Sequence, residues 1–480
     1  MTPRLRHLTL PLALALLAGC AVGPVYQPPG NAALGVPDSW HGHAPEKVTA
    51  DNLAQWWTLL GDAQLTALVQ DAVARNPDLD SARASLRAAR ARVSASEASR
   101  LPTLSASASA SQSKRGNAAT TDTYDVGFDA AWEPDLFGGT RHAVDAARAD
   151  TAAVEATLAN AQVSLAAETA LNYVQYRALQ ARILTLQRNL ASQQETLDLT
   201  RWRTQAGLVS PINLEQSTAT TEQSRAQLPV LQASLAAAAN RLAILTGRAP
   251  GALEQQLSDS APLPALPDRL VIGIPADTLR QRPDVIAAER KLAAETARTG
   301  VATANRYPSL RLSGSLGLDA LSAGALGESG SLYRSLTAGL TAPLFDGGKL
   351  KQQQAVQQAV QDQAYAAYRS TVLTALEDVE NALTNFASQR QRLQSLQTAA
   401  EAAGRADTLA RQNYQAGLAD FQTVLDAQRS RLSLEDSQIS CEADLITALV
   451  QLYKALGGGW TAPDAAPSKT SASTVTGNPS

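Results

Sequence analysis

The chain has 480 residues, with 41 basic and 44 acidic side chains and a formal net charge of −3. Such a balanced charge gives no reason to expect a nucleic-acid partner. The sequence shows no Ser-His-Asp, phosphate-loop or paired-carboxylate pattern. We therefore expect neither an enzyme nor a cofactor.

Residues 1–19 have the pattern of a secretory signal peptide. Two arginines precede an apolar run from Leu8 to Leu17, and Leu-Ala-Gly then leads to Cys20. The apolar run is too short to span a bilayer as a mature helix. Cys20 resembles the acylated first residue of bacterial lipoproteins, and Ala21 after it implies the outer membrane. If Cys20 carries lipid, Cys441 is the only other thiol, so no internal disulfide can form; we expect Cys441 to be a small buried packing residue.

Residues 20–75 are predicted to form a lipidated extended segment followed by a first helix. Prolines and glycines dominate from Val22 to Ala50, and a helical apolar face follows from Asn52 to Arg75. Trp56 and Trp57 on that helix are interpreted as packing anchors, with a binding box as the alternative. His41 and His43 have no further ligands nearby, so we expect a solvated loop and no metal site.

Residues 76–247 form the first of two predicted repeats. Asn76-Pro77 begins a helix that Pro102 stops. Alternating residues over 105–132 then predict a β-hairpin, although the Ser/Ala part at 105–111 is assigned only by its place in the repeat. A long proline-free helical hairpin follows, with its tip at 205–211.

The second repeat covers residues 282–460. The letters Gln-Ala-Gly-Leu at 205–208 recur at 415–418, which indicates a tandem duplication. The repeat has its own β-hairpin at 310–344 and a helical hairpin with its tip at 415–421. Its first long helix, from about 349 to 416, would be roughly 100 Å long. The proline-rich stretch 248–281 links the repeats, and the Ser/Thr/Pro-rich tail 461–480 is predicted to be disordered.

Four predicted strands cannot complete a membrane structure alone. Unpaired strand edges in a bilayer cost several kcal/mol per backbone group, and the smallest single-chain barrels use about eight strands. A chain with four strands must therefore pool them with copies of itself. The alternative is a soluble, half-buried sheet packed on the helices.

Several motifs together resemble the TolC-like outer-membrane efflux proteins, in particular their lipoprotein branch, NodT-like outer membrane factors that serve RND-type pumps. These motifs are Leu-Ala-Gly-Cys20-Ala-Val-Gly-Pro24, Trp56-Trp57, Asn76-Pro77-Asp78-Leu79, Leu136-Phe137-Gly138, Leu344-Phe345-Asp346-Gly347-Gly348, Leu425-Asp426-Ala427-Gln428 and the run from Leu452 to Trp460. The resemblance implies an α+β membrane protein that forms a homotrimer. Four strands from each chain would close a twelve-stranded transmembrane β-barrel, continuous with a long periplasmic α-helical barrel. Residues 248–281 would cross along an equatorial belt.

The same resemblance implies a passive exit duct for small molecules. An inner-membrane RND-type pump would deliver them through a periplasmic adaptor, and the duct would be held in the outer membrane by lipid on Cys20. Two alternatives remain open: an outer-membrane duct for type I protein secretion, and a periplasmic helical scaffold that never spans the membrane.

The hairpin tips are the predicted adaptor contacts. They comprise Gly207, Leu208, Val209 and Ser210 in the first repeat and Gly417, Leu418, Ala419 and Asp420 in the second. The simpler interpretation is that Gly207 and Gly417 only cap helices, and both roles can hold at once.

The predicted aperture lies just inside one tip. By the family resemblance, three copies of Asp426 would line a narrow axis, repel one another and attract cations. The alternative is an ordinary pair between Asp426 and Arg429, one turn apart on a solvated face. Tyr414 matches a position that links neighbouring helices, with Asn213 as its expected partner, and Gln422 stands where some relatives have leucine.

Overall fold

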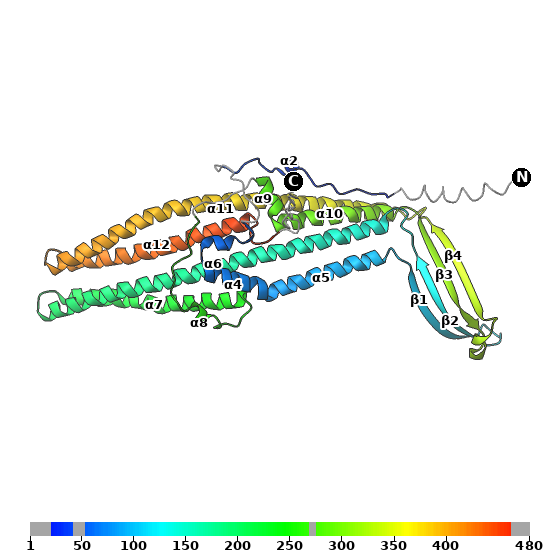
Figure 1. Ribbon diagram of the computed structural model, residues 1–480, viewed down its shortest axis with the longest axis horizontal. Helices are drawn as coiled ribbons and strands as arrows, with labels where there is room; N and C mark the ends of the chain where they lie inside the picture. The colour runs from blue at the N-terminus through cyan, green and yellow to red at the C-terminus, as the bar shows by residue number, and fades with distance from the viewer. Residues whose placement is uncertain (1–20, 42–52, 268–274, 462–480) are drawn as a thin grey trace, which may run out of the picture. The chain divides into compact units, whose positions relative to one another are not determined.

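The computed structural model describes residues 21–41, 53–267 and 275–461 (Figure 1). The predicted signal peptide, Cys20, His43 and nearly all of the predicted tail lie outside these ranges. The chain divides into two compact units. Of the described residues, unit 1 contains 21–34, 83–157 and 284–371, and unit 2 contains 35–41, 53–82, 158–267, 275–283 and 372–461. Each unit therefore takes corresponding parts of both repeats.

The main helices occur in pairs of equal length. There are 67 residues in each of α6 (Gly139–Gln205) and α11 (Lys349–Gln415), 35 in each of α7 (Pro211–Leu245) and α12 (Phe421–Ala455), and 22 in each of α5 (Pro77–Ala98) and α10 (Pro283–Ala304). A helix the length of α6 extends for about 100 Å. The equal lengths agree with a tandem duplication.

Unit 1 contains one four-stranded antiparallel sheet. Its strands follow the order β1 (Thr103–Ser113), β2 (Thr121–Trp132), β3 (Ser309–Ala320) and β4 (Leu332–Thr341). A short 3-10 helix, η2 (Ala323–Gly327), lies between β3 and β4. β4 ends before the predicted limit at 344 because Pro343 has no N–H for the ladder. β1 and β4 are the edge strands, and within the described residues neither has a second strand beside it.

The two faces of this sheet differ in polarity. Residues that are directly opposite in the register project from the same face. One such row is Ala108, Val126, Leu318 and Leu332, and a row on the other face is Ser105, Asp129, Ser315 and Ser335. The apolar face is largely uncovered: Phe128 is 56% exposed and Leu336 is 87% exposed. A soluble sheet packed on helices would bury these side chains, so the exposure argues against that alternative.

The segment that follows Ala21 lies against helices of unit 1. The Val22 amide donates to the Phe137 carbonyl over 3.1 Å, and a His142 ring nitrogen lies 3.0 Å from the Val22 carbonyl oxygen. A Cβ added to Gly300 would lie 2.6 Å from the His142 ring, so glycine is needed there. Further on, a short helix, α2 (Asn31–Leu34), interrupts the stretch predicted to be extended.

The predicted first helix over residues 52–75 is wrong in one respect. The chain forms a 3-10 turn, η1 (Trp56–Leu60), and then α4 (Ala63–Arg75), because Gly61 adopts a left-handed φ of 65° that ends the first element. The Asp62 carboxylate accepts hydrogen bonds from the Gln64 and Leu65 amides and so caps the start of α4.

The tryptophans of this region are core residues, as predicted. Trp56 is fully buried and stacks on Tyr453, with ring centroids 5.6 Å apart, while Trp57 is 6% exposed. Cys441 is also buried, and burial raises the pKa of its thiol. Both observations confirm packing roles in unit 2.

The same close junction occurs in both repeats. A Cβ on Gly247, just after α7, would lie 2.3 Å from the Arg75 carbonyl oxygen. A Cβ on Gly457, just after α12, would lie 3.0 Å from the Gln281 carbonyl oxygen. Both glycines have positive φ values, 68° and 77°. Each repeat thus ends where its glycine meets the backbone just before the Asn76-Pro77 or Arg282-Pro283 helix start.

The link between the repeats is not entirely irregular. Two short helices, α8 (Glu254–Leu257) and α9 (Pro275–Gln281), lie within the stretch predicted to lack periodicity. They were missed because four and seven residues are too few to show a helical period.

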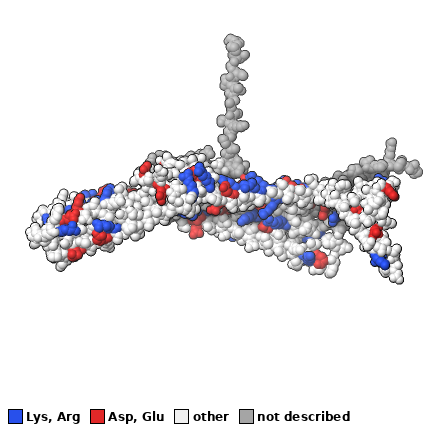
Figure 2. All heavy atoms as spheres, turned by 90° about the horizontal axis from the view of Figure 1, so that it is seen from below, with Lys and Arg blue, Asp and Glu red and all other residues white. Residues whose placement is uncertain are grey.

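Charges of both signs are interspersed over the face of the molecule in Figure 2. Several charges of the described chain form ion pairs, as Arg90 does with Glu155 and Arg182 does with Asp436. Surface pairs of this kind contribute only about 0–1 kcal/mol each. The visible face therefore has no single dominant sign of charge.

Candidate functional site

The two helical hairpins of unit 2 end in tips with the same backbone design. Gly207 and Gly417 adopt φ values of 71° and 78°. The Leu208 amide donates to the Arg203 carbonyl over 2.8 Å, and the Leu418 amide donates to the Asn413 carbonyl over 2.7 Å. These bonds satisfy carbonyls at the ends of α6 and α11, so both glycines do act as caps.

The helices that leave the tips begin with different caps. At Ser210 the hydroxyl accepts the Ile212 amide, and at Asp420 the carboxylate accepts the Thr423 amide over 2.9 Å. Hydrogen bonds from the Thr423 hydroxyl and amide hold the pKa of the Asp420 carboxyl below its ordinary value. Leu208 is 73% exposed and Leu418 is 80% exposed. The tips thus present apolar side chains to solvent on an ordered backbone.

Two of the predicted aperture residues, Gln422 and Asp426, are hydrogen-bonded to one another, and Arg429 bonds to α7. Asp426 accepts a hydrogen bond from the Gln422 amide group over 3.0 Å, and Arg429 donates to the Thr220 hydroxyl over 3.0 Å. Over residues 53–267 and 275–461, Asp426 and Arg429 form no ion pair. The ordinary i, i+3 pair considered from sequence is therefore not formed, because Arg429 reaches across to α7 instead.

Within the described residues of one chain, Tyr414 forms no side-chain hydrogen bond with Asn213. The Tyr414 hydroxyl is buried and has no hydrogen-bond partner among the described residues. Its ring packs on Phe421, with centroids 5.6 Å apart, in a cluster that includes Val424 and Leu425. Apolar packing of the ring therefore places Tyr414 in this cluster.

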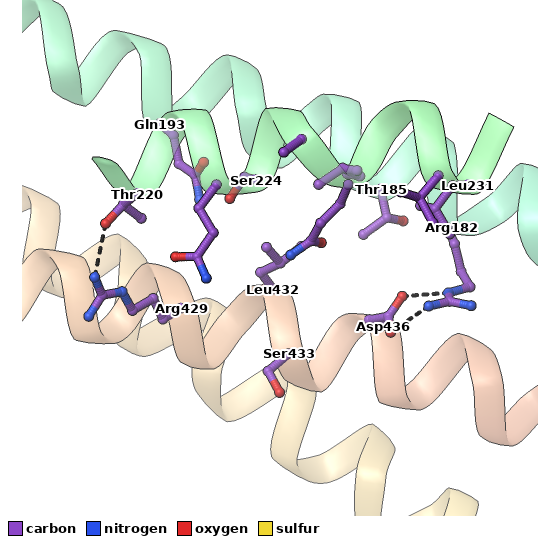
Figure 3. A pocket seen from close by; sticks show the side chains of 15 residues that line it. Arg182, Thr185, Gln193, Thr220, Ser224, Leu231, Arg429, Leu432, Ser433 and Asp436 are labelled. Carbon is purple, nitrogen blue, oxygen red and sulfur yellow. Dashed lines mark hydrogen bonds and ion pairs between the residues drawn. The ribbon is translucent and has the colours of Figure 1, made fainter. Parts of the chain in front are cut away.

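A cavity of about 990 Å³ lies among α6, α7 and α12 (Figure 3). Polar side chains line much of it, and the Oε1 atom of the buried Gln193 has no hydrogen-bond partner among the described residues. Arg182 closes one end by pairing with Asp436 over 2.6 Å, and the Arg429–Thr220 bond lies at the other end. The cavity therefore lies between an ion pair that joins α6 to α12 and a hydrogen bond that joins α7 to α12.

A buried ion-pair network was missed by the sequence interpretation. Asp407 on α11 is buried, and its carboxylate lies 3.1 Å from Arg411 and 2.9 Å from Arg431 of α12. Arg431 also contacts Glu435 over 2.8 Å, and the hydrogen bonds to Glu435 and Asp407 raise its pKa although desolvation opposes them. The i, i+4 spacing of Asp407 and Arg411 was visible in the sequence, but the partner on another helix was not.

Metal-binding groups are scattered in the described part of the chain. No cluster of three or more His, Cys, Asp or Glu side chains that could hold a metal ion occurs within residues 21–41, 53–267 and 275–461. The backbone amide of His41 instead donates to the Glu380 carboxylate over 2.8 Å. Among the described helices, α7 is the one that is long and apolar enough to cross a membrane, and one such helix does not by itself indicate a membrane span.

Comparison with known proteins identifies the family. The sequence profile of the family "Outer membrane efflux protein" matches residues 68–248 and 274–458. The outer membrane protein OprJ of Pseudomonas aeruginosa is 31% identical over 468 residues, which cover 94% of this chain and 95% of OprJ. Nodulation protein T of Rhizobium leguminosarum bv. trifolii is 31% identical over 467 residues, covering 95% and 98% of the two chains.

A solved structure of the outer-membrane channel OprN superposes on this fold with a TM-score of 0.84. The two sequences are 35% identical, and the match covers 92% of this chain and all of the OprN chain. The chain belongs to the outer membrane efflux protein family. It is a channel protein of the outer membrane that serves efflux, and the family and function predicted from the motifs are confirmed.

Proposed function

We propose that three copies of the chain join through their sheet edges into a closed transmembrane barrel of twelve strands. The observation that carries this proposal is a sheet with one exposed apolar face and two open edges, β1 and β4. In a bilayer each unpaired backbone group costs several kcal/mol. Pairing β4 of one copy with β1 of the next removes both edges at once.

In this assembly each face of the sheet has a defined environment. The apolar face, with Phe128, Leu336 and Leu340, lies against lipid, and the polar face, with Asp129 and Ser315, lines the water-filled interior. On that inner face Asp129 accepts hydrogen bonds from Ser107 and Ser315 over 3.3 and 2.8 Å. The helical hairpins form the periplasmic barrel, and residues 248–281 lie along its equatorial belt.

The trimer acts as a passive exit duct in a three-part efflux system. Small molecules arrive from an inner-membrane RND-type pump through a periplasmic adaptor, and acyl chains on Cys20 hold the protein to the outer membrane. The adaptor docks on the hairpin tips, where Leu208 and Leu418 are exposed and the cap hydrogen bonds keep the loops ordered. Asp426 lines the aperture just inside the tips.

Mass measurement of the membrane-extracted protein tests this proposal. We expect a denatured mass equal to residues 20–480 plus acyl chains, and a native mass in mild detergent three times as large. A Cys20→Ser variant is the matched control, since it should lose the added lipid mass. A native monomer, with or without lipid, would contradict the trimeric duct.

A further inference from the structure

We infer that Arg203 ties the end of the first helical hairpin to the end of the second and thereby restrains the opening of the channel at the tips. The tie itself is a contact within one chain. Its effect on closure rests on the proposed channel function. Arg203 was not among the aperture residues expected from the sequence.

Arg203, in the last turn of α6, reaches the end of α11. Its Nη1 donates to the Tyr414 carbonyl and its Nη2 donates to the Gln415 carbonyl, each over 3.1 Å. The guanidinium carbon also lies 4.6 Å from the centroid of the Tyr414 ring. A single side chain therefore makes two hydrogen bonds and a cation–π contact with the second hairpin.

The contact suits the chemistry of a helix end. The last carbonyls of α11 lack partners within the helix and carry a partial negative charge. The Gly417 and Leu418 amides satisfy the Tyr414 and Asn413 carbonyls. Gln415, the final residue of α11, receives its hydrogen bond from Arg203. Arg203 thus completes the cap of a helix that belongs to the other hairpin.

The duplication shows that the two tips contribute different residue types to this contact. Positions 203 and 204 correspond to 413 and 414, because Gln-Ala-Gly-Leu follows at 205 and at 415. The first tip has Arg203 and Thr204 where the second has Asn413 and Tyr414. The cation is therefore found in one tip and the aromatic ring in the other. Two tips that served only as their own caps would have no need of this complementary divergence.

Packing around Tyr414 supports the same assignment. Leu199, one turn before Arg203, packs against the cluster of Ala410, Tyr414, Phe421, Val424 and Leu425. The last two turns of α6 therefore hold the ring of Tyr414 from one side. Because the Tyr414 hydroxyl has no partner among the described residues, the ring and the carbonyl carry the contact. Any movement of the second hairpin away from α6 must break it.

Conductance of the full-length lipidated trimer in planar lipid bilayers tests the inference. Arg203→Met keeps the length of the side chain but removes its charge and donors, and we expect the time-averaged resting conductance to rise about tenfold. Arg203→Lys keeps the charge without the fork of donors and should give an intermediate value. Arg201→Met is the matched control, because Arg201 lies on the same turn and pairs with Asp198 over 3.1 Å.

Tyr414 variants separate the ring from the hydroxyl. We expect Tyr414→Phe to keep the wild-type resting conductance and Tyr414→Ala to reproduce Arg203→Met. If Arg203→Met does not assemble as a trimer by native mass, Tyr414→Ala carries the same test. Wild-type resting conductance in the assembled variant would overturn the inference. A wild-type protein that forms no channels would instead overturn the proposed function.

Discussion

The side-chain amide of Gln422 donates a 3.0 Å hydrogen bond to Oδ1 of Asp426, one turn further along α12. The partner is neutral, and within residues 53–267 and 275–461 no basic side chain forms an ion pair with Asp426. The carboxylate therefore keeps its negative charge available to its surroundings. In the proposed trimer, three such charges would meet near the axis.

We expect Asp426→Ala to increase single-channel conductance and to weaken block by added divalent cations, because it removes the anionic ring and its bulk. The measurement is a cation titration of channels in planar bilayers. Glu222→Gln is a suitable control, since Glu222 is an exposed acid on α7 that pairs with Arg225. Unchanged conductance and unchanged block in Asp426→Ala would remove Asp426 from the aperture.

Neighbouring positions on β4 should respond oppositely to a charge. Leu336 lies on the apolar face and Ser335 on the polar face. Leu336→Arg places a cation against lipid, which costs about 2–4 kcal/mol near the middle of the bilayer. We expect it to reduce the fraction of trimer in detergent extracts, whereas Ser335→Arg should leave that fraction near the wild-type value. Equal losses from both variants would mean that the two faces are not in lipid and water.

Two glycines with similar backbone angles should differ in their tolerance of alanine. A Cβ on Gly207 would meet nothing within 4 Å, so Gly207→Ala should cost only the left-handed strain of about 1 kcal/mol. A Cβ on Gly247 would lie 2.3 Å from the Arg75 carbonyl oxygen, so backbone must also move and the cost rises to about 2–4 kcal/mol. Thermal unfolding followed by circular dichroism should therefore show a clearly lower Tm for Gly247→Ala. A lower Tm for Gly207→Ala than for Gly247→Ala would contradict the close contact between Gly247 and the Arg75 backbone.

The cap at Asp420 should lose its effect only in acid. Hydrogen bonds from Thr423 hold the pKa of the Asp420 carboxyl below its ordinary value of 3.8. A carboxylate with a lower pKa in the folded chain stabilises the fold above its unfolded pKa, and that contribution disappears as the pH falls through the folded pKa. Hydrogen-exchange protection of the Thr423 amide should therefore hold from neutral pH down to about 4 and decrease below it.

The control for this cap is Asp420→Asn, whose amide oxygen still accepts a hydrogen bond but does not titrate in this range. Its Thr423 protection should not change with pH once intrinsic exchange rates are corrected for. Protection that falls equally in both proteins would assign the acid effect to a different group.

The sequence predicts the regular parts of this fold well. The repeated Gln-Ala-Gly-Leu motif and the helical spacing of apolar residues locate α6, α7, α11 and α12. In helices of this length a few residues that depart from the spacing do not hide it. The strand at 103–113 could be assigned only through the duplication, since Ser/Ala alternation carries little hydrophobic contrast. The break at Gly61 was missed because the apolar spacing continues across it.

The positions of the two tips were predictable, because the same four residues mark the end of the long helix in each repeat. Asp426 was assigned to the aperture only through the family resemblance, and that role stays a prediction. The contacts of Arg203 with Tyr414, and of Asp407 with Arg431, join different helices across long stretches of chain. Pairings of this kind depend on how helices pack, which a single sequence does not display.

The order β1-β2-β3-β4 gives the described part of each chain an even number of antiparallel strands. In a ring whose copies all point the same way through the membrane, β1 and β4 run in opposite directions. Every joint between copies therefore continues the antiparallel alternation without a break. A chain with an odd number of strands would instead place parallel neighbours at each joint. The parity of the strand count alone thus permits a seamless ring of identical subunits, and the head-to-tail joint of β4 to β1 sets a single direction around it.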